Sequence, residues 1–257
     1  QIGKYLLQKD SSVVLCSTGS LIEMLTFGPA LSVTSFPALN NSGDTISLLS
    51  PDKEHIHTAA YSDTWHSNDT KKIGGWSLEM IDPQKPCLGK SNWSSSEHLT
   101  GGTPGKTNSI NGNISSASQP ELWYAFANDP FTITLYFKST IDSNSSTNIG
   151  QFHIAAYSGN ILYAKPLPPL FDKIQIGIDI PLRDNVIYTI SADGVTDCSG
   201  NSIGLKNNVK FGLTSSPTTN DIVINEILFN PPSDGFDYVE LYNRSNKVIN
   251  LPSLLVS

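Results

Sequence analysis

Short runs of β-forming residues, separated by Gly, Pro, Asn and Asp, recur along the 257-residue chain. In the run at 131–137, Ile133, Leu135 and Phe137 alternate with Thr and Tyr positions. A period of two is typical of a strand that buries one face. The pattern predicts an all-β protein built of immunoglobulin-like (Ig-like) β-sandwiches in series. The other predicted strands lie at 12–17, 44–50, 152–157, 173–180, 186–192, 221–229 and 238–243.

Helical periodicity is almost absent, and only 20–28 crowds apolar residues as one or two helical turns or a buried loop would. Two polar stretches, 108–119 and 213–220, lack apolar periodicity and carry turn-forming residues throughout. They are predicted linkers. They divide the chain into 1–109, 120–213 and 221–257, and the middle part has roughly the seven alternating segments of an Ig-like sandwich.

Composition narrows the class of protein. The formal net charge is −7, 15% of the residues are charged and 38% are hydrophobic. The largest Lys/Arg cluster is the pair Lys71 and Lys72, so the basic stripe of a nucleic-acid-binding protein is missing. No apolar run reaches the roughly 20 residues that a membrane-spanning helix needs. Because the chain has neither a starting Met nor a signal peptide, we expect a segment of a longer precursor.

The middle part resembles a known family. Its runs ITLYFKSTID (133–142) and LRDNVIYTISADGVTDCSGNSIG (182–204) are similar to the bacterial Ig-like domain of surface-layer and other cell-envelope proteins. The resemblance covers roughly 125–213 and implies a seven-stranded sandwich without catalytic residues.

The flanking parts resemble a second family, the lamin tail domain, which is itself an Ig-like sandwich. Five motifs follow one another in that family's order: NNSGDTISLL, AAYSDTWH, GGWSLEMIDPQKPC, NW and GGTPGKTNS, all between residues 40 and 109. The runs 224–227, 237–243 and 249–251 are similar to the opening strands of the same family. The resemblance implies that 1–109 lacks its first strands and that 221–257 supplies them.

We therefore predict that 221–257 pairs with 1–109 by β-augmentation. Pairing within one chain leaves the Ig-like domain as an insert in a permuted sandwich, and this monomer is the favoured form. Pairing between chains gives a strand-swapped dimer. The alternative is a longer parent protein with two complete lamin-tail-like domains, each represented here in part.

Three cysteines, Cys16, Cys87 and Cys198, lie far apart and form no CxxC pair. One disulfide and one free thiol are expected in an oxidising compartment. Cys16 and Cys87 fall in the same lamin-tail-like part, so we predict that they pair and that Cys198 stays free. Two buried thiols are the alternative.

Two groups of residues are weak metal candidates. His55 and His57 are two apart, which on a regular strand places both rings on one face, although solvent-facing edge positions explain them as well. Asp193, Asp197 and Asn201 bracket a turn with the hard oxygen ligands that calcium prefers. Asx turns account for the same three residues without an ion, so no cofactor is predicted.

Tryptophans suggest a sugar site, because exposed indoles stack on pyranose rings. Trp65 and Trp93 lie in loops rich in Ser, Asn and His, whereas burial is the commoner fate of Trp. Nucleophile-elbow, HExxH and phosphate-loop motifs are missing. Glu79 lies among apolar neighbours, where a hydrogen-bonded structural carboxylate is the better interpretation.

These observations favour a non-catalytic secreted or cell-envelope module that acts as a spacer, adhesion or protein-interaction unit, with envelope proteins or surface glycans as partners. A carbohydrate-binding accessory module of an exported enzyme is the alternative. A third hypothesis places the segment in an exported nuclease or phosphatase, where lamin-tail-like modules also occur. All three rest on fold analogy.

Overall fold

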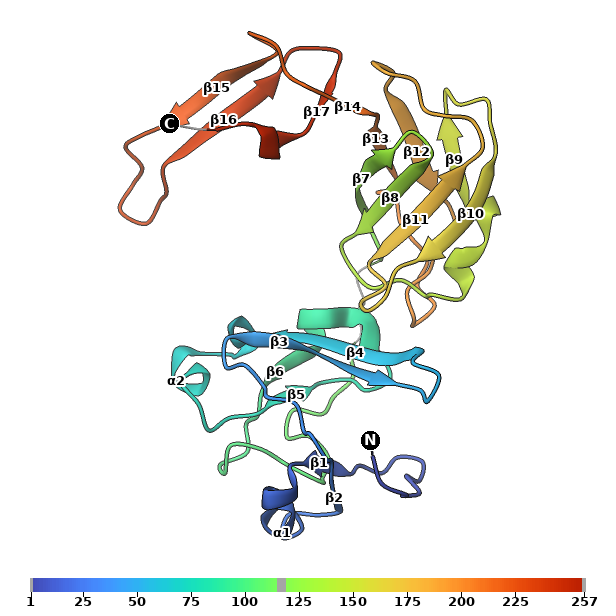
Figure 1. The fold of residues 1–257 in the computed structure, drawn as a ribbon. Helices are drawn as coiled ribbons and strands as arrows, with labels where there is room; N and C mark the ends of the chain where they lie inside the picture. Colours follow the sequence, from blue (N-terminus) through green and yellow to red (C-terminus); the bar gives the residue numbers. More distant parts are fainter. Residues whose placement is uncertain (1, 115–118, 256–257) are drawn as a thin grey trace. The chain divides into compact units, whose positions relative to one another are not determined.

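The computed structural model describes residues 2–114 and 119–255 and forms two compact units (Figure 1). Unit 1 is built mainly from Gln1–Ser118 and unit 2 mainly from Gln119–Ser257. The predicted all-β class is confirmed, because strands dominate both units. Part of the predicted linker at 108–119, residues 115–118, lies outside the described residues. Within the described ranges, no helix has the length and apolar character to cross a membrane.

Unit 2 contains a sandwich of two antiparallel sheets. One sheet has the order β10-β11-β8-β7 and the other β13-β12-β9. Short 3-10 turns, Ser145–Thr147 and Ile149–Gln151, precede β9. The strands are β7 (Leu122–Asp129), β8 (Thr132–Phe137), β9 (Phe152–Ala155), β10 (Ile161–Pro166), β11 (Lys173–Ile178), β12 (Tyr188–Ala192) and β13 (Asn208–Phe211).

The core of unit 2 lies between these sheets. Ile133 and Leu135 of β8 are fully buried, and Phe137 is nearly so, as the alternation in the sequence predicts. Ile174 and Ile176 of the neighbouring β11 are also fully buried and belong to the same apolar cluster. Inward-facing residues of both sheets thus form the core that is typical of an aligned sandwich.

The chain enters and leaves this sandwich at opposite ends. At the start of β7 the Leu122 N–H donates to the carbonyl of Lys206, just before β13 (2.8 Å). Past the end of β7, the carbonyl of Pro130 accepts a hydrogen bond from the loop 182–187. Gly212, which follows β13, approaches that same loop so closely that a Cβ would meet a carbonyl oxygen at 2.6 Å. Strands β7 and β13 therefore run side by side in the same direction.

After the sandwich, the chain forms a hairpin of β15 (Ile222–Leu228) and β16 (Tyr238–Asn243). At its base, β14 (Thr214–Ser215) pairs in parallel with β17 (Val248–Ile249). A 3-10 turn, Leu251–Ser253, follows. The stretch 213–220, predicted to be a linker, thus contains a strand that is paired within unit 2.

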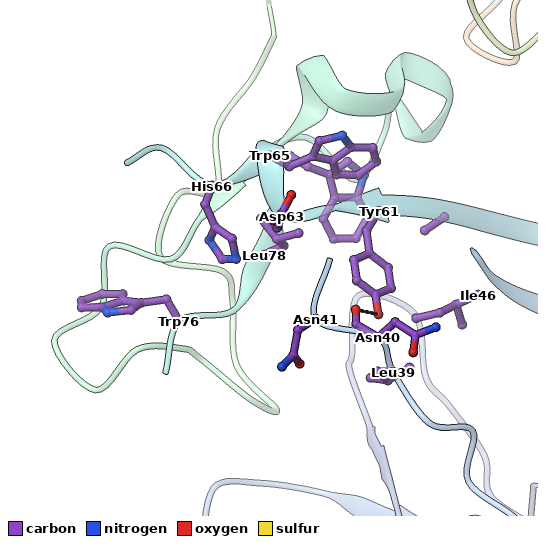
Figure 2. Close-up of a pocket in the computed structure, with 12 residues that line it drawn as sticks. Leu39, Asn40, Asn41, Ile46, Tyr61, Asp63, Trp65, His66, Trp76 and Leu78 are labelled. Carbon is purple, nitrogen blue, oxygen red and sulfur yellow. Dashed lines mark hydrogen bonds between the residues drawn. The ribbon is translucent and has the colours of Figure 1, made fainter. Parts of the chain in front are cut away.

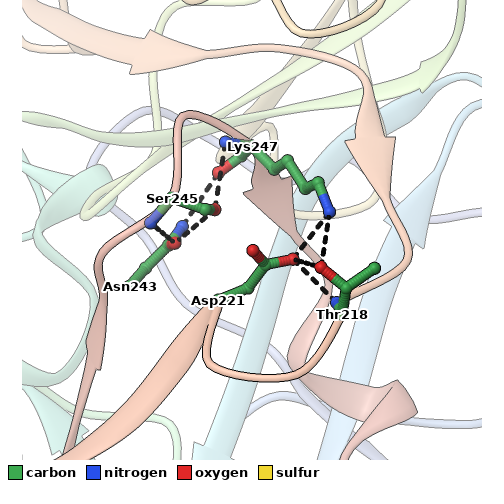
Figure 3. Close-up of polar contacts among 5 residues, drawn as sticks. All are labelled: Thr218, Asp221, Asn243, Ser245 and Lys247. Carbon is green, nitrogen blue, oxygen red and sulfur yellow. Dashed lines mark hydrogen bonds and ion pairs between the residues drawn. The ribbon is translucent and has the colours of Figure 1, made fainter.

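Hydrogen bonds hold the base of the hairpin (Figure 3). One carboxylate oxygen of Asp221 accepts from the backbone N–H and hydroxyl of Thr218 and from the Lys247 ammonium at 2.6 Å. Hydrogen bonding to Lys247, helped by the two bonds from Thr218, lowers the pKa of Asp221 to about 2. The ion pair therefore persists across the physiological pH range. On the other strand, the side-chain amide of Asn243 donates to the Lys247 carbonyl (2.8 Å) and its oxygen accepts from Ser245.

A β-bulge decides which side chains share a face of this hairpin. The register skips Asn225, so that Ile224 lies opposite Leu241 and Ile227 lies opposite Val239. Strict alternation along the strand would place Ile224 and Ile227 on opposite faces, but the extra residue reverses the alternation and brings them to the same face. One face is consequently wholly apolar apart from Asn243 at its end, and the other carries the acidic pair Glu226 and Glu240. The apolar face consists of Ile222, Ile224, Ile227, Val239 and Leu241.

Unit 1 is an assembly of three small strand pairs. β1 (Val14–Cys16) pairs in parallel with β2 (Ala30–Ser32), and one-turn helices, a 3-10 turn Thr18–Ser20 and α1 (Leu21–Met24), connect them. β3 (Gly43–Leu49) forms a hairpin with β4 (His55–Ser62). β5 (Leu78–Met80) pairs with β6 (Trp93–Ser95). The remaining elements are the 3-10 turns Asp63–Trp65 and Pro86–Asn92 and the short helix α2 (Asp69–Lys72).

Polar contacts, rather than an apolar core, hold unit 1 together. Its buried hydrophobic residues, within the described range, are Cys16, Ala30 and Cys87, which are all small. Asn92 is fully buried and accepts from the Asp82 N–H (2.7 Å) while it donates to the Asp82 carbonyl (2.8 Å). Because apolar burial is the main stabilising contribution in most domains, unit 1 depends unusually strongly on such bonds.

The predicted Cys16–Cys87 disulfide is wrong. Cys16 is a buried free thiol whose Sγ contacts the Leu31 carbonyl at 3.7 Å, because the pairing of β1 with β2 encloses it. Neither Cys87 nor Cys198 is a free thiol, so the free cysteine is Cys16 and not Cys198 as predicted.

Candidate functional site

The strongest candidate site in unit 1 is an open apolar hollow of about 350 Å³ (Figure 2). The face of the β3–β4 hairpin that carries Ile46, Ala59 and Tyr61 forms one wall, since Ile46 lies directly opposite Ala59 in the register. The β5–β6 pair contributes the other wall. The complete lining is Leu39, Asn40, Asn41, Ile46, Ala59, Tyr61, Asp63, Trp65, His66, Trp76, Leu78 and Trp93.

The two tryptophans singled out in the sequence meet in this hollow. Trp65 and Trp93 have ring centroids 6.1 Å apart and an interplanar angle of 39°, although 28 positions separate them along the chain. Trp65 ends the 3-10 turn after β4 and Trp93 begins β6, so two separate elements bring the rings together. Both rings are half-buried.

Polar groups at the margin of the hollow are engaged in other contacts. The Tyr61 hydroxyl donates to the Asn40 carbonyl at 2.9 Å (Figure 2). Asp63 forms an ion pair with Lys72 at 3.2 Å. Burial lowers the pKa of His66, Lys71 and Lys72 act in the same direction, and Asp63 opposes them. At neutral pH the imidazole is therefore uncharged, and the hollow presents mainly aromatic and aliphatic surface.

Glu79 of β5 is a buried carboxylate with a structural role. Oε1 accepts from the Thr103 hydroxyl, and Oε2 accepts from both the N–H and the hydroxyl of Ser109, each at 2.7 Å. Burial alone would raise the pKa of Glu79, but these hydrogen bonds and one from Ser96 outweigh it and lower the pKa. An ionised carboxylate fixed in this way anchors the loop 101–109 to β5 and is a poor general acid.

The histidine pair predicted on one face of a strand is divided by a second bulge. In the β3–β4 register, Leu48 lies opposite His57 and Leu49 lies opposite His55, with Ile56 as the extra residue. Since Leu48 and Leu49 point to opposite faces, the two histidines do as well, and the prediction of a shared face is wrong. Among the residues that the structure describes, no group of three or more His, Cys, Asp or Glu side chains is arranged to hold a metal ion.

The turn predicted as a weak calcium candidate is closed by its own hydrogen bonds. Asp197 is buried, and its Oδ1 accepts from the N–H groups of Ser199 (2.8 Å) and Asn201 (2.9 Å). Its Oδ2 accepts from the Asn201 amide at 2.8 Å. Asp193 binds the Asn207 amide instead. These are the bonds of an Asx turn, so this turn needs no ion to hold its shape.

Several lining residues of the hollow were missed by sequence reasoning. Ile46, Ala59 and Tyr61 are separated by a turn, and only the pairing of β3 with β4 brings them together. The sequence did contain a signal for them: Ile46 and Leu48 are two positions apart, as are Ala59 and Tyr61, which is the spacing of residues on one face of a strand. Trp76 lies just before β5, and the Lys71 ammonium lies 4.5 Å from the centroid of its ring.

Comparison with known proteins finds distant likenesses to solved structures. No family model and no curated protein matches the chain, so the lamin tail resemblance stays a prediction. The chain is similar to the N-terminal part of the bacterial S-layer protein SbsC, with 16% identity and a TM-score of 0.35 over 42% of this chain and 26% of that chain. It is also similar to SbsC domains 1–6, with 17% identity and a TM-score of 0.35 over 43% of this chain and 16% of that chain. The chain thus spans about a quarter or less of these structures.

Proposed function

We propose that the chain is a non-catalytic module of a secreted or cell-envelope protein and serves as a spacer, adhesion or protein-interaction unit. The buried carboxylate of unit 1 carries this proposal: both oxygens of Glu79 accept hydrogen bonds, Oε1 from Thr103 and Oε2 from Ser109. The apolar hollow beside it offers shape and aromatic surface, and its histidine is neutral. Such a surface suits recognition better than proton transfer.

Assays with esterase, phosphatase, nuclease and glycosidase substrates test this proposal. We expect the full chain to turn over none of them faster than a protein-free blank, because Glu79 is held as an acceptor and His55 and His57 point to opposite faces. Turnover that Glu79→Gln or His57→Ala abolished, in a variant with unchanged circular dichroism, would contradict it.

Carbohydrate binding is a second candidate function, and the proximity of Trp65 and Trp93 favours it. Two indoles about 6 Å apart, with Asn40 and Asn41 at the margin, supply apolar stacking surface together with amide donors. On a glycan array we expect any signal of the full chain to fall at least tenfold in Trp65→Ala. Trp123→Ala is the matched control, because this exposed tryptophan belongs to unit 2. An equal loss in both variants, or no signal for the wild type, argues against a sugar site in the hollow.

A further inference from the structure

The β15–β16 hairpin exposes an unusual amount of apolar surface. Ile227 on its apolar face is 55% exposed, and Phe229 and Phe236, which flank the loop between the strands, are 83% and 85% exposed. Within the described residues, β15 and β16 pair only with each other. A lone two-stranded hairpin is marginally stable in water, and exposed strand edges readily add another strand.

Unit 1, in turn, has an apolar surface that is not covered. Its β3–β4 hairpin likewise forms a two-stranded sheet, and the hollow lies on the apolar side of that sheet. Ile46 at the edge of the hollow is 41% exposed, and Leu48 on the same face is similarly exposed. β3 and β15 each have seven residues, so they match in length. Unit 1 thus offers an apolar wall but too few apolar side chains to cover it.

We propose that the apolar face of the β15–β16 hairpin docks in the hollow of unit 1 of a second copy of this chain. The docked hairpin would bring Ile224, Ile227 and Leu241 against Ile46, Ala59 and the tryptophans of the partner. The apolar face of the hairpin carries no charged side chain, and the carboxylate that lines the hollow, Asp63, is already paired with Lys72. The acidic pair Glu226 and Glu240 lies on the other face of the hairpin and stays in water.

The area available suits a stable interface. The apolar face and the two phenylalanines expose on the order of 700 Å² together, if each aromatic side chain offers roughly 150–250 Å² in full. Each partner contributes about 800 Å² to an interface of standard size. One hairpin therefore provides nearly one side of such an interface.

The sequence prediction favoured pairing within one chain, but the path of the chain through unit 2 favours docking in a second copy. Leu122, which starts the first strand of the sandwich, lies at one end of it, whereas Gly212 and the hairpin base lie at the other end. The eight residues of β7 separate these ends by roughly 25 Å at about 3.3 Å per residue. The base cannot slide toward the first end, because β14 pairs with β17 and Lys247 binds Asp221. To reach the hollow of its own chain, the hairpin would have to fold back toward the first end of the sandwich. Docking in another copy does not require the hairpin to fold back.

Complementary variants of the full chain test the proposal. Ile227→Glu places a charge on the apolar face of the hairpin and leaves the hollow intact, while Ile46→Glu charges the hollow and leaves the hairpin intact. We expect the wild type to associate as its concentration rises in sedimentation velocity, and each variant alone to remain monomeric. An equimolar mixture should form dimers, because one good hairpin then meets one good hollow.

Matched controls carry the same charge on the outer faces. Tyr242→Glu changes a residue that is 56% exposed on the other face of the hairpin, and Thr45→Glu changes the other face of β3. Both should associate like the wild type. A wild type that stays monomeric overturns the proposal. If Ile227→Glu then also lowers the melting temperature of unit 1, the occupant is the hairpin of the same chain; if that temperature is unchanged, the hairpin does not fill the hollow at all.

Discussion

Replacing Ile133 with alanine should lower the free energy of unfolding of unit 2 by about 3 kcal/mol. Ile133 is fully buried in β8, where the register places it opposite Ala127 of β7 and Ile176 of β11. Removing three carbon atoms from a site enclosed by two strands and the facing sheet leaves a cavity that the strands cannot close. Differential scanning calorimetry, combined with urea unfolding followed by circular dichroism, measures the loss.

Two further variants serve as comparisons for Ile133→Ala. Ile133→Val removes one methylene group and should cost about 1 kcal/mol. Thr132→Ala changes the adjacent residue, which is only partly buried, and should cost less than about 1 kcal/mol. A loss for Ile133→Ala as small as that for Thr132→Ala would mean that β8 is not at the centre of the core.

Replacing Glu79 with alanine should lower the free energy of unfolding of unit 1 by about 3 kcal/mol, because buried donors are left without an acceptor. The orphaned groups are the Thr103 hydroxyl and the N–H of Ser109, and no apolar core offsets their loss. Trp65, Trp76 and Trp93 all belong to unit 1, so tryptophan fluorescence during urea unfolding reports mainly on this unit.

The contribution of Glu79 should also depend on pH. The pKa of this carboxylate is lower in the folded protein than in the unfolded chain, where it is about 4.3. Its contribution is therefore complete above the unfolded value and is lost as the pH falls through the lowered folded value. Glu79→Gln should flatten the acid limb of the stability curve of unit 1. Glu97→Ala, an exposed glutamate in the same unit, is the control and should leave that limb unchanged.

Regular strands were predictable because one repeating pattern determines them. The alternation of Ile133, Leu135 and Phe137 gave both the strand and its buried face, although Thr134 on the other face is buried as well. The two bulges were not predictable in this way. A single extra residue at Asn225 or Ile56 reverses the alternation, and only the partner strand reveals which residue is skipped.

The candidate site depended on contacts distant in sequence. The sequence indicated Trp65 and Trp93 as candidate ligand-binding residues, but it did not show that they lie close together. Their proximity follows from the turn after β4 and the start of β6. The cysteine prediction failed for a related reason. The separation of two cysteines along the chain does not tell how far apart they lie in space. The short parallel pair β1–β2 that encloses Cys16 also has no periodic pattern in the sequence.

The direction of β7 and β13 has a mechanical consequence. Tension applied through the points where the chain enters and leaves the sandwich acts along both strands, so they must be sheared past one another before unit 2 extends. The β15–β16 hairpin responds differently, because Ile222 and Asn243 are paired at its base and lie beside each other. A pull across those two residues would open the ladder one pair at a time, like a zipper. Under load the hairpin should therefore yield at a much lower force than the sandwich that carries it.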